Sequence, residues 1–230
     1  MIEDPPLLTI RKNFDRIPRE VIAELEGAQT GHIVDAMRGR GAMDGTIKAV
    51  DPNRSRFIGS AFPCETGPSD NLAIMAAVAL AQEGDVIVAA SDAFDRTAVC
   101  GDIVAMLARN AGCAGLVIDG MARDLIGLEA VGLPVFSRGI TPNSCVKSGP
   151  GLVGLPIVAG GVRIKAGDLV MGDRDGVVVV PREDLDRVIA DVKAIRQAEA
   201  DIIRRVGQEN LTGFGYIEGV LNSDKVRYVD

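Results

Sequence analysis

The sequence predicts an α/β fold with a mainly parallel central sheet, added antiparallel strands and a long C-terminal helix. Three observations predict it. Strand-like and helix-like segments alternate between residues 85 and 137, short apolar segments separated by turns follow, and a long amphipathic segment comes near the end. Alternation of this kind is typical of a parallel sheet covered by helices.

Four elements precede or open the centre of the chain. Pro18 to Gly27 has the pattern of a short helix closed by glycine, and a strand ends near Phe62-Pro63. Ser69 is expected to be the N-cap of an apolar helix from Asp70 to Gln82. Residues 85–90 form a short continuous apolar run, which predicts a buried strand.

The centre of the chain has the clearest pattern. After the strand at 85–90 we expect, in order, a helix from Gly101-Asp102 to about Gly112, a strand from Gly115 to Asp119, a helix opening near Arg123-Asp124 and a strand around Leu133 to Ser137. This βαβαβ order predicts parallel neighbours in one sheet.

The last third of the chain changes character. Short segments at Val162–Ile164, Leu169–Met171 and Gly176–Val180 are separated by turns, which predicts added antiparallel strands. A long amphipathic helix is expected from about Glu183 to Val206.

Composition limits the class of protein. With 230 residues, 47% hydrophobic and 25% charged, we expect residues 1–230 to form a single domain. The net charge of −7 argues against nucleic acid or an anionic membrane as the main partner. The start lacks the pattern of a signal peptide, and the longest apolar stretch, Leu72 to Ala81, is about half a membrane span, so we expect a cytoplasmic protein.

Two predicted strand-to-helix junctions carry the residues of chemical interest. One delivers Gly101, Asp102, Ile103 and Val104 to a helix start, and the other delivers Arg123 and Asp124. Ligands of open α/β sheets bind at the carboxyl ends of the strands, and a helix N-terminus favours an anion such as a carboxylate. The guanidinium suits a carboxylate or a developing enolate, and the two carboxylates suit Mg²⁺ or Mn²⁺.

Simpler interpretations of these residues remain open. An Asp at a helix start is usually a cap, and an adjacent Arg-Asp pair is commonly surface electrostatics. Glu199 falls inside the apolar stripe of the long helix, so it either reaches a neighbouring subunit's active site or meets water where the helix end frays.

Other candidates are weaker. Asp173 and Asp175 have the pattern of turn residues, and nothing near Lys147 or Lys165 suggests a lowered pKa for Schiff-base chemistry. The single histidine, His32, rules out a multi-histidine metal site, and Cys100 has no evident activating base. The four cysteines contain no C-x-x-C pair and do not predict a disulfide scaffold.

The central block, residues 84–139, resembles the RraA-like family. That family comprises the 4-hydroxy-4-methyl-2-oxoglutarate/4-carboxy-4-hydroxy-2-oxoadipate aldolases and the regulator of ribonuclease activity A. The most specific similarities are GD at 101–102, RD at 123–124 and DGVVVVP at 175–181, and the terminal KVRYVD also resembles the aldolase branch. The resemblance covers the chain from about Ile33 onward.

The resemblance implies a layered β/β/α fold of the swivelling-domain type, assembled as a homotrimer or homohexamer with active sites at subunit interfaces. It implies that Asp124 is the direct ligand of Mg²⁺ (or Mn²⁺) and that Asp102 holds metal-bound water. Arg123 would contact the keto or enolate oxygen, and the backbone from Gly101 to Val104 would bind the pyruvoyl carboxylate. Glu199 matches a glutamate that these aldolases donate from an adjacent subunit.

The reaction implied is a class II retro-aldol cleavage of a 4-hydroxy-2-oxo acid to pyruvate and a second oxo acid, as in aromatic compound catabolism. The same site is expected to decarboxylate oxaloacetate. The sequence departs from the characterised aldolases at Val34-Asp35, where they carry His-Glu, and at Asn71-Leu72-Ala73, where they carry Asn-Trp-Met. Both departures concern the part of the pocket that binds the far end of the substrate.

Two alternative functions stay open for this sequence and a third is excluded. A non-catalytic regulator that binds ribonuclease E would suit the acidic charge, but the retained Asp102, Arg123, Asp124 and Glu199 favour an enzyme. A metal-dependent decarboxylase or hydrolase of another small oxo acid could use the same metal site. A methyltransferase is rejected, because no strand is followed by a glycine-rich cofactor loop.

Overall fold

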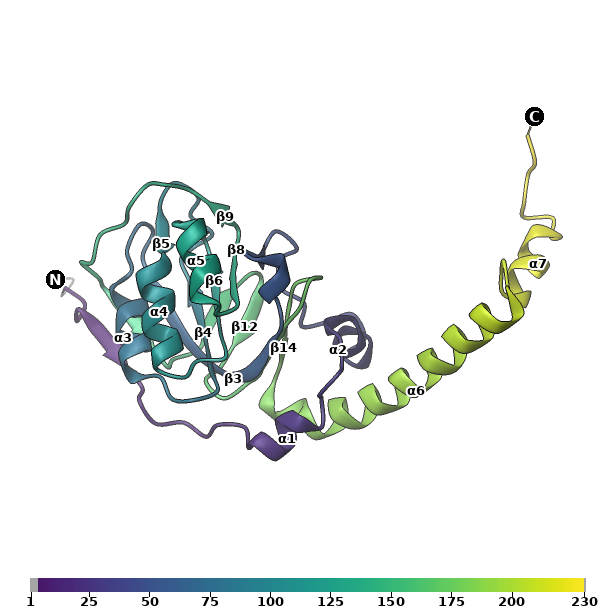
Figure 1. The fold of residues 1–230 in the computed structure, drawn as a ribbon, viewed down its shortest axis with the longest axis horizontal. Coiled ribbons are helices and arrows are strands. Elements are labelled where there is room, and N and C mark those ends of the chain that lie inside the picture. Colours follow the sequence, from purple (N-terminus) through teal and green to yellow (C-terminus); the bar gives the residue numbers. More distant parts are fainter. Residues whose placement is uncertain (1–3, 230) are drawn as a thin grey trace. The chain divides into compact units, whose positions relative to one another are not determined.

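In the computed structural model, which describes residues 4–229, helices α3, α4 and α5 cover one face of a central sheet (Figure 1). The α-helices are α1 Arg19–Ala23, α2 Thr30–Ala36, α3 Leu72–Leu80, α4 Asp102–Asn110, α5 Leu125–Val131, α6 Leu185–Glu209 and α7 Gly215–Leu221. Short 3-10 helices cover Pro52–Arg54 and Arg182–Asp184.

The strands are β1 Leu8–Ile10, β2 Lys48–Ala49, β3 Phe57–Thr66, β4 Asp85–Ala90, β5 Ala98–Cys100, β6 Gly115–Asp119, β7 Met121–Ala122, β8 Val135–Ser137, β9 Gly139–Ile140, β10 Gly151–Val153, β11 Ile157–Ala159, β12 Val162–Ile164, β13 Leu169–Gly172 and β14 Val177–Val180. The main sheet has the order β1-β10-β3-β4-β6-β8-β2, with β13 pairing with both β3 and β14. A three-stranded sheet has the order β5-β7-β9, and β11 pairs with β12.

The predicted parallel core is confirmed. Strands β3, β4, β6 and β8 are parallel neighbours, with Val88 of β4 opposite Val117 of β6. Every residue of β4 and β6 is buried, because helices cover one face of the sheet and further strands cover the other. Continuous apolar runs are the signature of strands covered on both faces.

Two apolar cores account for the layers. On the helical face, side chains of α3, α4 and α5 pack with Ile87 and Leu116 of the sheet. On the opposite face, Val86 and Val117 pack with residues of the β11–β12 hairpin such as Ile157. The result is the β/β/α layering that the sequence resemblance implies.

Two details of the predicted elements are wrong. Ser69 is not the N-cap of α3: it has a left-handed φ of 61°, and the helix begins at Leu72 with Asn71 in the N-cap position. Asp70 supplies the capping oxygen, since its carboxylate accepts a hydrogen bond from the Leu72 N–H at 2.8 Å. The first helix is also shorter than predicted and covers only Arg19–Ala23.

The late strands form as predicted and join the main sheet. The β13–β14 hairpin is antiparallel, and β13 also pairs antiparallel with β3. The turn between its strands closes on Asp173, whose carboxylate accepts from the Thr30 N–H at 2.7 Å at the start of α2. Asp173 therefore has the structural role that its sequence context indicates.

The chain divides into two compact units, one ending at Val192 and the other beginning at Lys193. Helix α6 contributes to both. Its apolar stripe is buried at Leu185, Val188, Ile189 and Val192. Within residues 4–229, no helix has both the length and the apolar character needed to cross a membrane.

Candidate active site

The two predicted helix starts meet beside the three-stranded sheet, where they directly follow the short strands β5 and β7 and not, as predicted, the strands at 85–90 and 115–119. Strands β5 and β7 pair in parallel, and the Arg123 N–H donates to the Cys100 carbonyl at 2.9 Å. Helix α4 starts directly after β5, with Gly101 as its N-cap, and α5 starts directly after Arg123-Asp124. Both helix starts therefore face the same edge of the sheet, as expected for an α/β ligand site.

A cavity of about 260 Å³ lies between these junctions. It contains the predicted residues Gly101, Asp102, Ile103, Val104, Arg123 and Asp124. The remaining lining residues are Asn71, Met75, Ala98, Val99, Cys100, Ser144, Cys145 and Lys147. Glu199 is exposed and belongs to the unit that begins at Lys193, so the predicted buried seam ends before it within this chain.

Gly101 allows the two junctions to approach each other closely. A Cβ atom built on Gly101 would lie 2.4 Å from Oδ2 of Asp124, closer than any real contact. Gly127 of α5 has the same relation to Asp102, whose Oδ2 would lie 2.4 Å from an added Cβ. Each carboxylate thus occupies space that a glycine leaves open.

Asp124 has an unusual backbone conformation. Its φ of 61° is left-handed, which costs a non-glycine residue about 1 kcal/mol, and it occupies the N-cap position of α5 without any side-chain capping hydrogen bond. The capping interpretation therefore does not hold for Asp124. Its carboxylate instead pairs with Nε of Arg123 at 3.1 Å.

Asp102 shows a different local arrangement. It is the first residue of α4, and its Oδ1 accepts from the Ile103 N–H at 2.7 Å. The first backbone N–H groups of a helix have no partner inside the helix, so this end of α4 presents donors and a favourable dipole to an anion.

Arg123 is held from two sides. Besides Asp124, its Nη1 donates to Oγ of Ser144, which lies in the loop after β9. Asp70 fastens that loop, because its carboxylate accepts from the N–H groups of Ser148 and Gly149. The guanidinium is thus fixed beside the cavity before any ligand binds, although 38% of its side chain stays exposed.

The cavity does not contain an activated thiol. Burial, with smaller contributions from Cys145 and the Asp124 and Asp102 carboxylates, raises the pKa of the Cys100 thiol to about 12. A thiol with this pKa stays protonated at neutral pH and is a weak nucleophile. Burial therefore keeps Cys100 from acting as a nucleophile at neutral pH.

The carboxylates fit a magnesium-type ion. Mg²⁺ is held by one or two carboxylates and retains several waters, whereas structural zinc takes four protein ligands and catalytic zinc three. Asp124 and Asp102 both line the cavity, and Gly101 leaves room for the Asp124 carboxylate. Among residues 4–229, no group of three or more His, Cys, Asp or Glu side chains is placed to hold a metal. The donor set therefore suits Mg²⁺ or Mn²⁺ rather than zinc.

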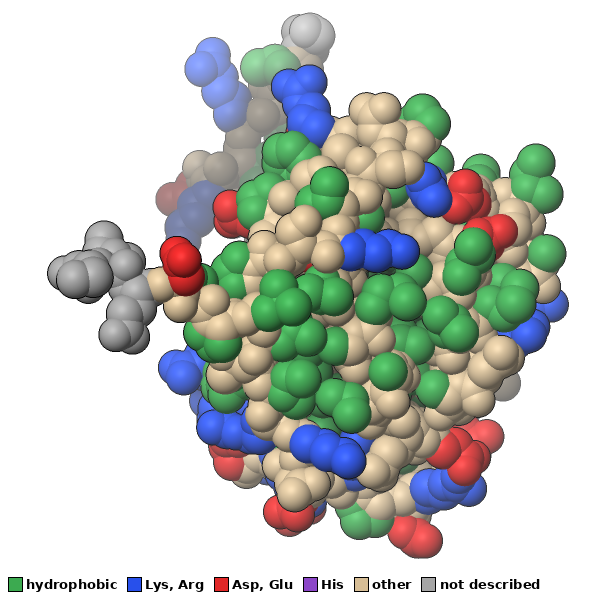
Figure 2. Space-filling model, turned by 90° about the vertical axis from the view of Figure 1, so that its left-hand side faces the viewer, with side chains coloured by type: hydrophobic (Ala, Val, Ile, Leu, Met, Phe, Trp, Pro, Cys, Tyr) green, Lys and Arg blue, Asp and Glu red, His purple; other side chains and the backbone are tan. Residues whose placement is uncertain are grey.

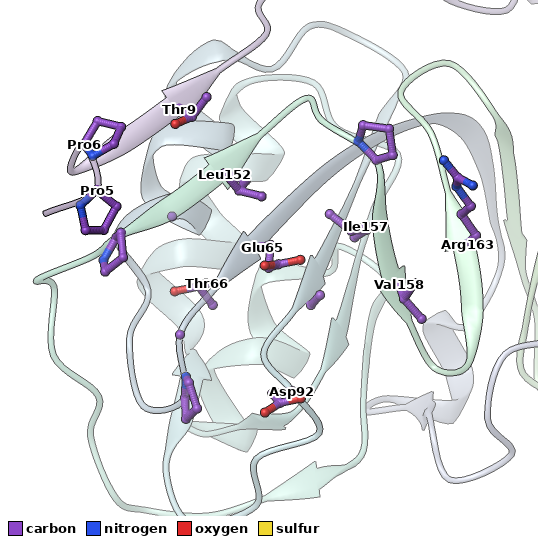
Figure 3. A pocket seen from close by; sticks show the side chains of 16 residues that line it. Pro5, Pro6, Thr9, Glu65, Thr66, Asp92, Leu152, Ile157, Val158 and Arg163 are labelled. Carbon is purple, nitrogen blue, oxygen red and sulfur yellow. The ribbon is translucent and has the colours of Figure 1, made fainter. Parts of the chain in front are cut away.

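A larger groove of about 800 Å³ lies elsewhere, between the N-terminal segment, the end of β3 and the β11–β12 hairpin (Figure 3). Its charged side chains are Glu65, Asp92 and Arg163, and none of the predicted site residues lines it. The chemistry-bearing residues gather instead in the smaller cavity.

Sequence reasoning missed several lining residues of the smaller cavity. In the sequence, Asn71 stands out only as part of a departure from the aldolases and Lys147 only as a Schiff-base candidate, and no pattern points to Ser144. The other departure, Val34-Asp35, lies on α2 and does not line the cavity. No spacing in the sequence could have brought the 144–147 loop to the two junctions.

Apolar side chains lie beside the site. Ile103 of α4 is 68% exposed and Ile126 of α5 is 83% exposed, and Met106, Leu107 and Leu125 are partly exposed on the same helices. Figure 2 views the molecule from the side on which α3 lies in Figure 1, and apolar side chains gather across the middle of that face.

Comparisons with known proteins identify the family of this chain. The model of the RraA-like family, described as Aldolase/RraA, matches residues 30–179. A protein of Halalkalibacterium halodurans named "Putative 4-hydroxy-4-methyl-2-oxoglutarate aldolase" is 34% identical over 88% of this chain and 96% of its own length.

Two solved structures have the same fold. A crystal structure of a protein from Pseudomonas syringae pv. tomato has a TM-score of 0.73 at 30% identity, covering 85% of this chain and 96% of that one. The RNA-processing inhibitor RraA from Thermus thermophilis has a TM-score of 0.62 at 27% identity, covering 67% of this chain and 93% of that one. On its sequence and its fold, the chain belongs to the RraA-like family.

Proposed function

We propose that this protein is a class II, divalent-metal-dependent pyruvate aldolase that cleaves a 4-hydroxy-2-oxo acid to pyruvate and a second oxo acid. The observation that carries the proposal is the convergence of Arg123, Asp124 and the Gly101-Asp102 helix start on one cavity. The similarity to the H. halodurans protein supports the same reaction class and a substrate of the 4-hydroxy-4-methyl-2-oxoglutarate type. The resemblance to the aldolase branch adds 4-carboxy-4-hydroxy-2-oxoadipate as a second candidate.

The charges of the cavity favour a dicarboxylic substrate. Asp102 and Asp124 contribute two negative charges, and Arg123 and Lys147 contribute two positive charges, so the lining is neutral in sum. A bound divalent cation would leave an excess of two positive charges. 4-Hydroxy-4-methyl-2-oxoglutarate has two carboxylates and so two negative charges at neutral pH, which matches this excess, whereas 4-carboxy-4-hydroxy-2-oxoadipate has a third carboxylate.

Asp124 is the proposed metal ligand, and Asp102 holds a water beside it. When Mg²⁺ or Mn²⁺ is bound, it would supply Lewis-acid polarisation of the substrate's 2-oxo group. The N–H groups from Gly101 to Val104 bind the carboxylate next to that group, because the helix dipole favours negative charge there.

The remaining residues move protons and stabilise charge. The water held by Asp102 takes the C4 hydroxyl proton, and the electron pair of that O–H bond forms the new C4 carbonyl while the C3–C4 bond breaks. The electrons of the broken bond form pyruvate enolate, and Arg123 donates hydrogen bonds to its oxygen. A proton returned from water to C3 completes pyruvate. Loss of CO₂ from oxaloacetate forms the same enolate, so oxaloacetate decarboxylation is a proposed side activity.

A homo-oligomer, trimer or hexamer, with Glu199 acting in an adjacent subunit's site is part of the proposal. Two observations support it. Apolar side chains of α4 and α5 beside the cavity are exposed in the single chain. The stripe of α6 beyond Val192 is exposed as well, with Ile203 at 64%.

The test is pyruvate release from 4-hydroxy-4-methyl-2-oxoglutarate, coupled to lactate dehydrogenase. The wild type with Mg²⁺ is compared with EDTA-treated enzyme and with Asp124→Asn, and oxaloacetate is the second substrate. Arg163→Gln, in the larger groove, is the matched control for loss of a charge away from the site. We expect pyruvate release that stops with EDTA, that is lost in Asp124→Asn and that is retained in Arg163→Gln.

Other outcomes point elsewhere. Turnover of oxaloacetate alone would keep the metal and enolate site but move the function to decarboxylation, or to cleavage of an aldol other than 4-hydroxy-4-methyl-2-oxoglutarate. No turnover of either substrate would favour a regulator that binds ribonuclease E, since the family also contains the T. thermophilis RNA-processing inhibitor. A binding assay with ribonuclease E would then decide.

A further inference from the structure

A buried oxygen without a hydrogen bond lies in the wall of the cavity. Asn71 is 6% exposed, and its side-chain Oδ1 has no hydrogen-bond partner in the structure. Among the described residues, the other such buried oxygen is Oγ1 of Thr97. Of these two residues, Asn71 lines the cavity that contains Arg123 and Asp124, and Thr97 does not. Neither Asn71 nor Thr97 lines the larger groove.

The fold gives the Asn71 side chain no structural task. Asn71 occupies the N-cap position of α3, where an amide oxygen ordinarily accepts from the first turn, but it makes no such bond. Asp70 takes that role through its bond from the Leu72 N–H. Asn71 contributes only its backbone, which donates to the Val146 carbonyl at 3.1 Å and accepts from the Met75 N–H at 3.0 Å.

A buried acceptor left unpaired is costly, so a persisting one indicates a donor supplied from outside the chain. The guanidinium of Arg123 donates to Ser144 and pairs with Asp124, and it makes no hydrogen bond to Oδ1 of Asn71. Under the proposed function, two donors enter the cavity, the C4 hydroxyl of the substrate and the water that receives its proton. The hydroxyl has a single hydrogen, which it must give up in the reaction. The water has two.

We propose that Asn71 is a positioning residue that orients the proton-accepting water of the aldol cleavage, an inference that rests on the proposed function. The water donates one hydrogen to Oδ1 of Asn71 and the other to the carboxylate of Asp102. Its lone pair is then directed at the C4 hydroxyl. As the hydroxyl proton passes to the water, the hydrogen shared with Asp102 passes to that carboxylate, so no proton is gained or lost.

Two substitutions separate this role from packing. Asn71→Leu fills the same space without an acceptor, whereas Asn71→Ala leaves room for an additional water whose oxygen can accept in place of the amide. If Asn71 orients the water, Asn71→Leu lowers kcat for cleavage about 10-fold or more while KM changes little. Asn71→Ala should retain more activity than Asn71→Leu. A packing role gives the opposite order, because Ala leaves a void that Leu fills.

Oxaloacetate provides the internal control, since its decarboxylation removes no hydroxyl proton. The Asn71→Leu variant is expected to keep oxaloacetate decarboxylation within about 3-fold of wild type while cleavage falls. Thermal unfolding tests the variant in the absence of substrate and metal. Asn71→Leu should leave Tm unchanged or raise it, because the substitution removes the unpaired buried acceptor.

The outcomes are distinguishable. Wild-type enzyme that releases no pyruvate from either substrate would overturn the proposed function and this inference with it. Active wild type with equal losses of cleavage and decarboxylation in Asn71→Leu, or with less activity in Asn71→Ala than in Asn71→Leu, would overturn the inference alone. A rise in KM without a change in kcat would also overturn it, because that result indicates direct substrate contact.

Discussion

Replacing Gly101 with alanine tests whether the close approach of Asp124 to the start of α4 matters for activity. Gly101 has an extended backbone, with φ of −137°, so alanine can adopt its conformation without strain. The whole effect of the substitution therefore comes from the added Cβ.

The size of the effect follows from the distances. The Cβ would lie 2.4 Å from Oδ2 of Asp124, whereas ordinary van der Waals contact begins at 3.4 Å, so the carboxylate must move by about 1 Å. The same Cβ would lie 3.3 Å from Cγ of Arg123, which limits where the carboxylate can go. A displacement of about 1 Å in a catalytic group can cost about 100-fold in rate.

The stability cost should be small, because the displaced atom is the end of a side chain that is 41% exposed. We expect kcat/KM for pyruvate release to fall about 100-fold while Tm stays within about 2 °C of wild type. Gly31→Ala is the matched control, because no atom lies within 4 Å of its added Cβ, and it should keep full activity. Full activity in Gly101→Ala, or a loss explained by a large fall in Tm, would refute the reasoning.

Two further substitutions test the support of the site. Burial opposes ionisation of Asp70, but hydrogen bonds from the backbone N–H groups of residues 72, 148 and 149 and from the Thr66 hydroxyl outweigh it and hold the pKa of this carboxyl below its usual range. Asp70→Asn should therefore lower the free energy of unfolding by about 2 kcal/mol in urea denaturation at pH 7, and a loss under about 0.5 kcal/mol would contradict this. Because the folded-state pKa is lowered, the contribution is complete above about pH 5 and is lost as the pH falls below about 4, so the wild type and the variant should converge in acid. Ser144→Ala removes a hydrogen bond to Arg123 and should lower kcat/KM about 5- to 10-fold in the pyruvate assay at unchanged Tm, whereas unchanged kinetics would show that Arg123 needs no such support.

The central layer of the fold is readable in the sequence because its signal is local. Residues 85–90 and 115–119 are continuous apolar runs, each followed by a glycine-containing loop and a helix start, and they form β4 and β6 as predicted. The pairing of β13 with β3 could not be predicted, since β3 lies more than a hundred positions earlier and no local pattern encodes its partner.

The candidate site is likewise predictable only in part from the sequence. Gly101, Asp102, Arg123 and Asp124 lie at the two predicted helix starts, but the strands that bring them together are β5 and β7, which the sequence does not predict. Ser144 and Lys147 reach the cavity only because their loop is tied to Asp70, at a sequence separation of 78 from Ser148. Nothing in the sequence signals the left-handed backbone of Asp124.

Glu199 illustrates the limit of a periodic pattern. The apolar spacing of the long helix predicts one continuous seam, and the structure buries it as far as Val192. Beyond that point Ile202, Ile203 and Val206 are exposed in the single chain. Periodicity identifies a face that another surface can cover, but it cannot say which surface does.

The central claim is that Arg123 and Asp124 form a site that stabilises pyruvate enolate. Exchange of the pyruvate methyl protons in D₂O, followed by NMR, tests it directly and does not depend on knowing the second product. We predict exchange that requires Mg²⁺ or Mn²⁺, stops with EDTA, and falls at least about 100-fold in Arg123→Ala and Asp124→Asn. Exchange no faster than in buffer with the metal alone, or exchange that survives both substitutions, would contradict the account.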